Sequence, residues 1–497
     1  MHKKYLSVAV ASALFAMSFG AHAATGPSSS ASPYVTPTAA GVEVTSIISV
    51  GDAASNGYKM VGIPDGLGAY DNGGNTFTVL MNHELGASLG SVRAHGATGA
   101  FVSEWVINKN TLQVISGNDL ATQHLVSNGA GGWTAAAGTS NSFARLCSAD
   151  LPAVSAFYNA STGMGTQSRI FMNGEETGAE GRAYAFVATG ADKGKAYELP
   201  MLGKSSWENS LANPYSGNAT VVALTDDSTP GQVYIYKGTK TNTGNDVEKA
   251  GLNNGSLYGI KVGGVTTETG AINGAFTLEQ VNANQTGALM NTESNGKSIT
   301  NFARPEDAQW ADADTLYFVT TGSAAGGSAK LYRADFNGTM DGGTITMVKD
   351  SASLIGSDGA AARSFDNMTV GEDGKLYIQE DPGNSSYIAK TWSFDPATGK
   401  FTQILESDRS RFLPGATFLT QDEENSGIIE VTSILGRNDG KRYFLADTQA
   451  HYGIPGELVE GGQLYVVSMP VPEPESYAMF LAGLGLLGLA ARRRNAK

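Results

Sequence analysis

The feature that most constrains this chain is a loose internal repeat of short β-rich runs separated by turn residues. Residues 304–336 contain an acidic cluster, an Asp-Ala-Asp turn, a β-rich run, a Gly-rich loop and a second β-rich run. Residues 364–394 contain the same parts in the same order. Residues 79–84 and 170–176 form another matched pair, in which a β-rich run ends in acidic residues. Strand hairpins that recur at roughly 40–60 residues are typical of a β-propeller.

The rest of the chain agrees with an all-β fold class. Outside its two ends, no long stretch has the 3.6-residue period of a helix. Short runs rich in β-branched and aromatic residues are instead bounded by Gly, Asn, Asp or Pro. They are residues 77–81, 169–172, 233–236, 316–319, 376–378 and 464–467. We therefore expect a β-propeller with short helices in its loops; an array of β-sandwiches is the alternative.

The N-terminal residues have the pattern of an export signal. Lys3 and Lys4 precede an apolar run over residues 5–19, and Ala-His-Ala at 21–23 provides the small residues of a cleavage site. Residues 1–23 are thus predicted to be a secretory signal peptide, with a membrane anchor as the alternative. The polar segment 24–40 is predicted to be a disordered linker, and residues 41–469 the propeller domain.

Composition excludes some classes of partner and favours others. The net charge is −14, only 16% of residues are charged, and no basic run precedes the C-terminal tail. This balance argues against a nucleic-acid partner and suits a protein that holds cations. Cys147 is the only cysteine, so no intrachain disulfide can form.

Acidic clusters at strand ends are the candidate metal ligands. One motif per blade would place carboxylates around a central channel, where they would repel one another unless cations lay between them. Oxygen ligands suit hard ions such as Ca²⁺, Fe³⁺ or Mn²⁺. The candidates are Glu84, Glu175, Glu176, Glu306, Asp307, Asp366, Glu380 and Asp381, with Asn82, His83, Asn367 and His451 as further site residues.

Arg304 has two alternative roles. It precedes Pro305, which favours an extended Arg304 backbone at the start of a strand. A planar fork of donors beside clustered carboxylates fits a phosphoryl group held with cations. In the other role, Arg304 would pair with Asp307 or Glu380 and brace two blades.

The tail resembles a PEP-CTERM sorting signal of Gram-negative, exopolysaccharide-producing bacteria. Pro-Glu-Pro at 472–474 is followed by an apolar, Gly-rich run over residues 477–491 and by three arginines at 492–494. The resemblance implies that residues 470–497 are a sorting tail with transient membrane contact, cleaved near Pro-Glu-Pro by an exosortase. A plain C-terminal anchor is the alternative.

The order of the motifs between the two ends resembles the PhoX family of alkaline phosphatases, once known only as a domain of unknown function. The motifs are Asn82-His83-Glu84, Gly174-Glu175-Glu176, Arg304-Pro305-Glu306-Asp307, Asp366-Asn367 and Glu380-Asp381. The resemblance implies a propeller of about six blades with calcium and iron at the channel mouth. It also implies that Glu84, Glu175, Glu176, Glu306 and Glu380 are metal ligands and that Arg304 contacts phosphate.

The chain departs from the PhoX pattern at one metal ligand. PhoX proteins have a cysteine, an iron ligand, before the Glu-Glu pair, whereas this chain has Gly174. Cys147 either reaches the site from a loop or is a small buried thiol. The signal also lacks the Arg-Arg pair with which PhoX proteins typically leave the cell, so we expect the general secretory route.

Together these observations predict a metal-dependent phosphomonoesterase that acts on small phosphate esters at the cell envelope, cell surface or extracellular matrix. Arg304 would be its catalytic residue. The alternative is a non-catalytic, calcium-stabilised propeller that acts with exopolysaccharide in the biofilm matrix. A sugar-lactone or phytase-like propeller hydrolase is a third option.

Overall fold

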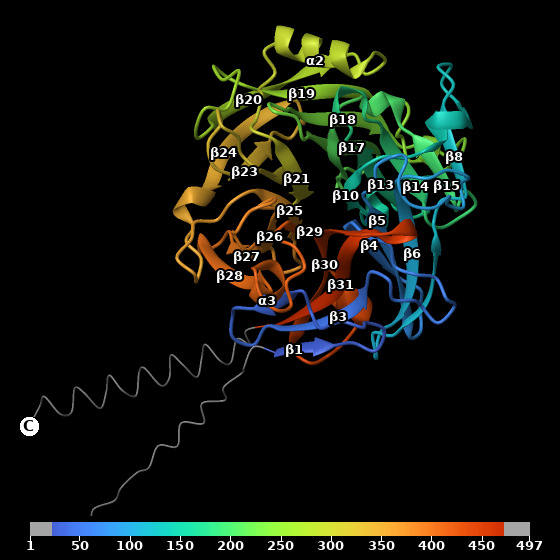
Figure 1. Ribbon diagram of the computed structural model, residues 1–497. Coiled ribbons are helices and arrows are strands. Elements are labelled where there is room, and N and C mark those ends of the chain that lie inside the picture. The colour runs from blue at the N-terminus through green and yellow to red at the C-terminus, as the bar shows by residue number, and fades with distance from the viewer. Residues whose placement is uncertain (1–21, 472–497) are drawn as a thin grey trace, which may run out of the picture.

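The computed structural model describes residues 22–471, and these form a ring of six β-blades around a central channel (Figure 1). Residues 1–21 of the predicted signal peptide and the tail from residue 472 onward lie outside this described range, whereas His22 and Ala23 at the predicted cleavage site lie within it. Among residues 22–471 there is no helix long and apolar enough to cross a bilayer.

These six blades, built from five β-sheets, form a propeller. In each blade the innermost strand contacts the innermost strands of the two neighbouring blades, so that β4, β10, β16, β21, β25 and β29 close a ring within residues 22–471. This closure confirms the predicted propeller and excludes the sandwich array. From the inside outward, blade 1 contains β4 (Pro64–Asp71), β5 (Thr76–His83), β6 (Phe101–Asn108) and β7 (Val114–Asp119). Blade 2 contains β10 (Leu146–Asp150), β13 (Ile170–Glu175), β14 (Ala183–Val187) and β15 (Lys195–Glu198), and is extended by β8 (Gln123–Ser127) and β9 (Trp133–Ala135). Blade 3 contains β16 (Trp207–Ala212), β17 (Ala219–Asp226), β18 (Val233–Thr239), β19 (Ser256–Val262) and β20 (Asn273–Val281).

Blades 4–6 follow the same plan, and β20 pairs with β24 so that blades 3 and 4 share one nine-stranded sheet. Blade 4 contains β21 (Pro305–Trp310), β22 (Thr315–Thr320), β23 (Lys330–Phe336) and β24 (Gly342–Asp350). Blade 5 contains β25 (Phe365–Val370), β26 (Leu376–Glu380), β27 (Lys390–Asp395), β28 (Lys400–Ser407) and β2 (Val35–Pro37). Blade 6 contains β29 (Glu423–Glu430), β30 (Lys441–Ile454), β31 (Val459–Pro470), β3 (Glu43–Ser49) and β1 (His22–Thr25).

The helices are short and lie in connections. The α-helices of the described chain are α1 (Asp246–Lys249), α2 (Gly287–Gly296), α3 (Arg409–Phe412) and α4 (Thr432–Leu435). Its 3₁₀ turns are η1 (Gly138–Asn141), η2 (Val154–Ala156), η3 (Gly178–Glu180), η4 (Pro200–Leu202), η5 (Ser351–Ser353) and η6 (Gly456–Leu458), and the small hairpin β11 (Tyr158–Asn159) and β12 (Met164–Gly165) completes the elements.

The apolar core lies between neighbouring blades. A separate cluster of buried apolar side chains fills each of the six interfaces, for example Trp207, Tyr234 and Leu199 between blades 2 and 3. Each blade is therefore apolar on both faces, which agrees with the apolar β-rich runs of the sequence. Because the blades interlock in this way, the strand ends at the channel mouth are held on a rigid frame.

The segment predicted to be a disordered linker is ordered instead. Within residues 24–40, β2 pairs with β28 of blade 5, and β1 pairs with β3. Strand β3 in turn pairs with β31, so the N-terminal chain completes the blade built by the C-terminal chain. The polar composition of 24–40 did not indicate this, because β2 pairs with a strand about 370 residues away and β1 pairs with β3, which itself depends on the distant β31.

Candidate functional site

A β-bulge near the start of every inner strand shapes the channel mouth. The register between the inner strand and the second strand shifts in all six blades, for example between Pro64 and Leu67 and between Pro305 and Ala308. Bulges re-aim side chains and often lie beside functional sites. The second residue of each inner strand thereby forms what we call the inner ring: Asp65, Cys147, Glu208, Glu306, Asp366 and Glu424.

A second set of six positions surrounds the first. The first residue of each inner strand pairs with one residue of the second strand, as Pro64 does with His83 and Phe365 with Glu380. The residue that follows this partner forms what we call the outer ring. Its members are Glu84, Glu176, Asp227, Thr321, Asp381 and His451.

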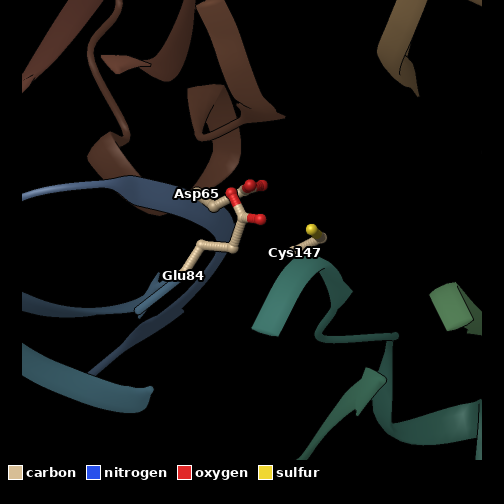
Figure 2. A group of neighbouring side chains, drawn as sticks. All are labelled: Asp65, Glu84 and Cys147. Atoms are coloured by element: carbon tan, nitrogen blue, oxygen red, sulfur yellow. The ribbon is translucent and has the colours of Figure 1, made fainter. Parts of the chain in front are cut away.

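Several members of the two rings lie within metal-ligand distance of one another. Asp65, Glu84 and Cys147 offer ligand atoms that all lie within 4.8 Å, and Figure 2 shows their oxygen and sulfur atoms turned toward a common space. The same limit holds for Cys147, Glu176 and Glu208 and for Glu208, Glu306 and Asp366. Because these three groups share Cys147 and Glu208, they form one continuous array across the mouth.

Two arginines hold the array from equivalent positions. Arg145 and Arg304 each precede an inner strand, and both have left-handed backbones, with φ of 45° and 61°. The Arg304 Nε and Nη2 atoms donate to the two Asp227 oxygens at 2.8 and 2.7 Å, and Nη2 lies 3.1 Å from Glu306. Arg145 contacts Glu84 at 2.8 Å and also pairs with Glu176. Strained φ values of this kind are typical of functional sites.

The backbone of Arg304 differs from the extended conformation that Pro305 favours. Its carbonyl accepts a hydrogen bond from the Thr321 amide, and its side chain is paired with Asp227. These tertiary contacts outweigh the local preference. Arg304 therefore braces Asp227 rather than Asp307 or Glu380, and among the described residues its Nη1 has no hydrogen-bond partner.

Burial makes the carboxylates hard to ionise together. It is the largest cause that raises the pKa of Asp65, Glu208, Glu306 and Asp366 well above the usual range, and neighbouring carboxylates raise it further. Burial also raises the pKa of Glu176 and of Asp381 to about 7. Nine carboxylates in the two rings face only two guanidinium groups and one imidazole, so protons or bound cations must balance them.

His451 provides the imidazole. Its Nδ1 lies 2.6 Å from Glu460 and its Nε2 lies 3.8 Å from Glu424. Although burial lowers the pKa of His451, hydrogen bonds and charges of these two carboxylates raise it to about 11. His451 is thus a cationic member of the outer ring, in contact with the inner ring through Glu424.

Buried amides and a hydroxyl connect the rings to the blades. The Gln449 amide nitrogen donates to Asp65 at 2.9 Å and to Glu84 at 3.1 Å, whereas its buried oxygen has no partner among the described residues. Ser148 donates to Glu208 at 2.6 Å and accepts from the Asn367 amide at 2.5 Å. Asn82 donates to the Cys147 carbonyl at 2.5 Å. Asn82 and Asn367 therefore position ring residues from behind.

Besides Arg304, Asn82 and Asn367, which contact or position ring residues, four predicted site residues lie outside the rings. Glu175 is bound on both oxygens by Arg182, at 2.9 and 3.1 Å, and Glu380 accepts from Trp392, Tyr387 and two backbone amides. His83 lies between the Gly62 carbonyl and the Ser103 hydroxyl. Side chains of a strand alternate between its faces, so the residue before each outer-ring position points away from the mouth. Glu84 and Glu306 thus belong to the rings, whereas Glu175 and Glu380 make structural hydrogen bonds behind them.

Asp307 is the fourth. It lies one residue beyond the inner ring and accepts from the Asn209 amide at 2.7 Å and from the Met368 backbone at 2.9 Å. It lines a narrow channel cavity of about 20 Å³ below the mouth, together with residues from all six inner strands. Asp307 thus belongs to the channel wall.

The sequence did not single out four acidic members of the rings. Asp65, Glu208, Asp227 and Glu424 lie outside the motifs that first indicated the site. Asp226-Asp227 ends a strand as Glu175-Glu176 does, and Asp65, Glu208 and Glu424 each occupy the second position of an inner strand. Alignment of the six inner-strand starts would have found Asp65, Glu208 and Glu424, and alignment of the second-strand ends would have found Asp227.

Cys147 supplies the thiol that Gly174 lacks. A side chain at Gly174 would collide with Trp207, because an added Cβ would lie 2.4 Å from the Trp207 Cβ. Cys147 instead lies in β10 within the inner ring, 6% exposed, and burial raises the pKa of its thiol well above the usual value. The thiol thus reaches the array from a strand rather than from a loop.

The residues present fit hard cations. The donor set is almost entirely carboxylate oxygen, supplemented by an amide oxygen without a partner and one thiol. Oxygen-rich donor sets of this kind suit Ca²⁺, and a donor set that includes a thiol can also bind a transition metal such as iron.

Comparison with known proteins identifies the tail and the fold. Residues 470–494 match the PEP-CTERM protein-sorting motif, which indicates export and sorting to the surface or envelope of a Gram-negative bacterium. No curated protein is significantly similar to this sequence. Pseudomonas fluorescens PhoX, solved in complex with vanadate, a transition state analogue, is similar in structure, with a TM-score of 0.56 and 13% identity over 86% of this chain and 95% of that one.

Two other solved structures are more distant. A fungal alcohol oxidase of the AA5 family has a TM-score of 0.39 and 12% identity over 84% of this chain and 76% of its own. The α-L-arabinofuranosidase PaAbf62A from Podospora anserina has a TM-score of 0.32 and 9% identity over 91% of this chain and 98% of its own. The chain thus combines a propeller with the fold of PhoX and a C-terminal PEP-CTERM sorting motif.

Proposed function

We propose that this protein is an exported, metal-dependent phosphomonoesterase that acts on small phosphate esters. The observation that carries the proposal is the pair of acidic rings at the channel mouth, with Arg304 beside Glu306 on a fold shared with a vanadate-binding phosphatase. Phosphoryl transfer needs mainly positioning and neutralisation of charge on the equatorial oxygens, and this arrangement can supply both.

Calcium and iron are the proposed cofactors. Cations held by Asp65, Glu84, Glu176, Glu208, Glu306 and Asp366 would neutralise the substrate oxygens and activate a water nucleophile. Arg304 would turn its free Nη1 toward a phosphate oxygen while Asp227 fixes the rest of its guanidinium group. Arg145 would favour the ionised forms of Glu84 and Glu176 against the effect of burial and hold both in place, and His451 would do the same for Glu424.

The decisive experiment measures phosphate release from p-nitrophenyl phosphate by purified protein supplied with Ca²⁺ and iron. We expect turnover at neutral to alkaline pH and none after chelation. Bound metal without turnover across that range would refute the phosphatase.

One observation favours a second function. Two donors of Arg304, Nε and Nη2, are already bonded to Asp227, as in a purely structural pair. A calcium-stabilised, non-catalytic propeller of the exopolysaccharide matrix would have this arrangement. Strong thermal stabilisation by Ca²⁺ without phosphatase activity would support this function. The general secretory route and cleavage by an exosortase belong to both proposals.

A further inference from the structure

The described ends of the chain lie together, at the strand ends opposite the mouth. Glu423, beside the inner ring, pairs with Ala450, and Ala450 pairs with Gly461. Gly461 therefore lies on β31 at the same level as the channel mouth. Pro470 lies nine residues farther along β31 and pairs with Lys441 at the far end of blade 6. At about 3.3 Å per residue, the path from the mouth to the last strand residue is about 30 Å.

The N-terminal strand ends at the same corner. His22 pairs with Glu43, and Glu43 pairs with Ser468, so three adjacent strands bring His22 beside the end of β31. Figure 1 shows β1 and β3 at this outer edge of blade 6, away from the central channel. Both targeting segments are therefore joined to the propeller at one corner of its far face.

The connection between the propeller and the tail is short. Val471 is 39% exposed, and the apolar run of the tail begins six residues later, at Tyr477. Six residues span at most about 20 Å even when fully extended. This reach is less than the length of β31, so the connection cannot pass around the blade to the mouth.

We propose that, while the tail is inserted in a bilayer, the far corner of blade 6 faces the lipid and the channel mouth opens away from it. The partner surface is the corner formed by the ends of β31, β3 and β1. In this orientation the rings meet soluble or matrix-bound molecules, and headgroups of the anchoring bilayer are out of reach. The proposal rests on the tail as a membrane anchor and is independent of the phosphatase activity.

The test compares two fluorophore positions in adjacent blades. Val92, 68% exposed, lies in the connection from β5 to β6 on the mouth side, whereas exposed Asn438 lies in the turn before β30 at the far end of blade 6. Val92→Cys and Asn438→Cys are labelled with a thiol-reactive donor in the full-length chain. The wild-type chain, whose buried Cys147 should react little, is the labelling control.

The labelled proteins are reconstituted in vesicles that contain a lipid-linked acceptor. We expect a clearly larger loss of donor emission at position 438 than at position 92, and recovery at both positions after detergent is added. An equal loss at both positions, or a larger loss at position 92, would overturn the proposed orientation. Failure of the chain to associate with the vesicles would overturn its premise, the membrane anchor, and leave phosphatase activity unaffected.

Discussion

At the residue scale, membership of the site depends on alternation along a strand. In Asn82-His83-Glu84 only Glu84 joins the outer ring, while His83 is buried between blade strands and burial lowers its pKa to about 3. In Glu175-Glu176 and Glu380-Asp381 the second acid joins the ring and the first makes structural hydrogen bonds. Adjacent carboxylates of the same type thus have opposite roles.

We expect Glu208→Gln to weaken cation binding more than Glu380→Gln does. Both acids are buried, but Glu208 belongs to two of the three ligand groups, whereas Glu380 is already saturated by protein donors. Titration with Ca²⁺ followed by isothermal calorimetry measures the difference. Equal affinities in the two variants would contradict the assignment of the inner ring.

Arg304→Lys should cost about 2–4 kcal/mol of transition-state stabilisation, as the loss of one oxyanion donor does, because lysine keeps the charge but loses the planar fork. Its melting temperature should change little. Arg182→Lys is the matched control, since Arg182 forms a bidentate pair with Glu175 outside the rings. We expect the control to keep kcat/KM per folded molecule, and the idea fails if both variants lose activity equally.

At the element scale, bulges and left-handed turns aim the rings. Ile63, Arg145, Arg304 and Ser364 each precede an inner strand and have φ between 43° and 61°. Behind Arg304, the Ala303 amide donates to Glu268, which pairs with Lys330 at 2.9 Å, and both side chains are at most 2% exposed. Lys330 also donates to the carbonyls of Gly326 and Ser328, so this buried pair ties the turn before β21 to the loop after β22.

Lys330→Met should therefore lower the free energy of unfolding by about 3–5 kcal/mol, because it leaves Glu268 buried without a counter-charge. The double variant Glu268→Gln, Lys330→Met should lose less, since the glutamine can still accept from the Ala303 amide without an unpaired charge. Urea unfolding of the two variants decides the point. A double variant that is less stable than the single one would contradict it.

At the scale of the whole molecule, the excess of acids couples folding to protons and cations. The pKa of Asp65, Glu84, Glu176, Glu208, Glu306, Asp366 and Asp381 is raised, chiefly by burial. A raised folded-state pKa contributes stability at low pH that is lost as the pH rises through it. His83, His95 and His124, whose pKa values burial lowers, act in the opposite sense below about pH 6.5, but three imidazoles face seven acids.

In cation-free protein we therefore expect the free energy of unfolding to rise as the pH falls from 8 to 5, through the pKa of about 7 of Glu176 and Asp381. Added Ca²⁺ should stabilise the protein most at pH 8 and progressively less toward pH 5, because protons compete for the same carboxylates. Urea midpoints with EDTA and with CaCl₂ across this range provide the measurement. A urea midpoint that falls on acidification in EDTA, or that does not change when Ca²⁺ is added at pH 8, would contradict the coupling of folding to protons and cations.

The sequence by itself determined the all-β class, the repeated hairpins, the acid-rich strand ends and the sorting motif, because period, turn residues and composition are local properties. Only the tertiary structure decided which acids face the mouth. Asp65, Glu208 and Glu424 have no local motif; they meet because six bulged strands start at one level of a closed ring. Residues 24–49 likewise complete blades 5 and 6 through strand pairs with partners about 370 residues or more away, and no local pattern encodes such pairing.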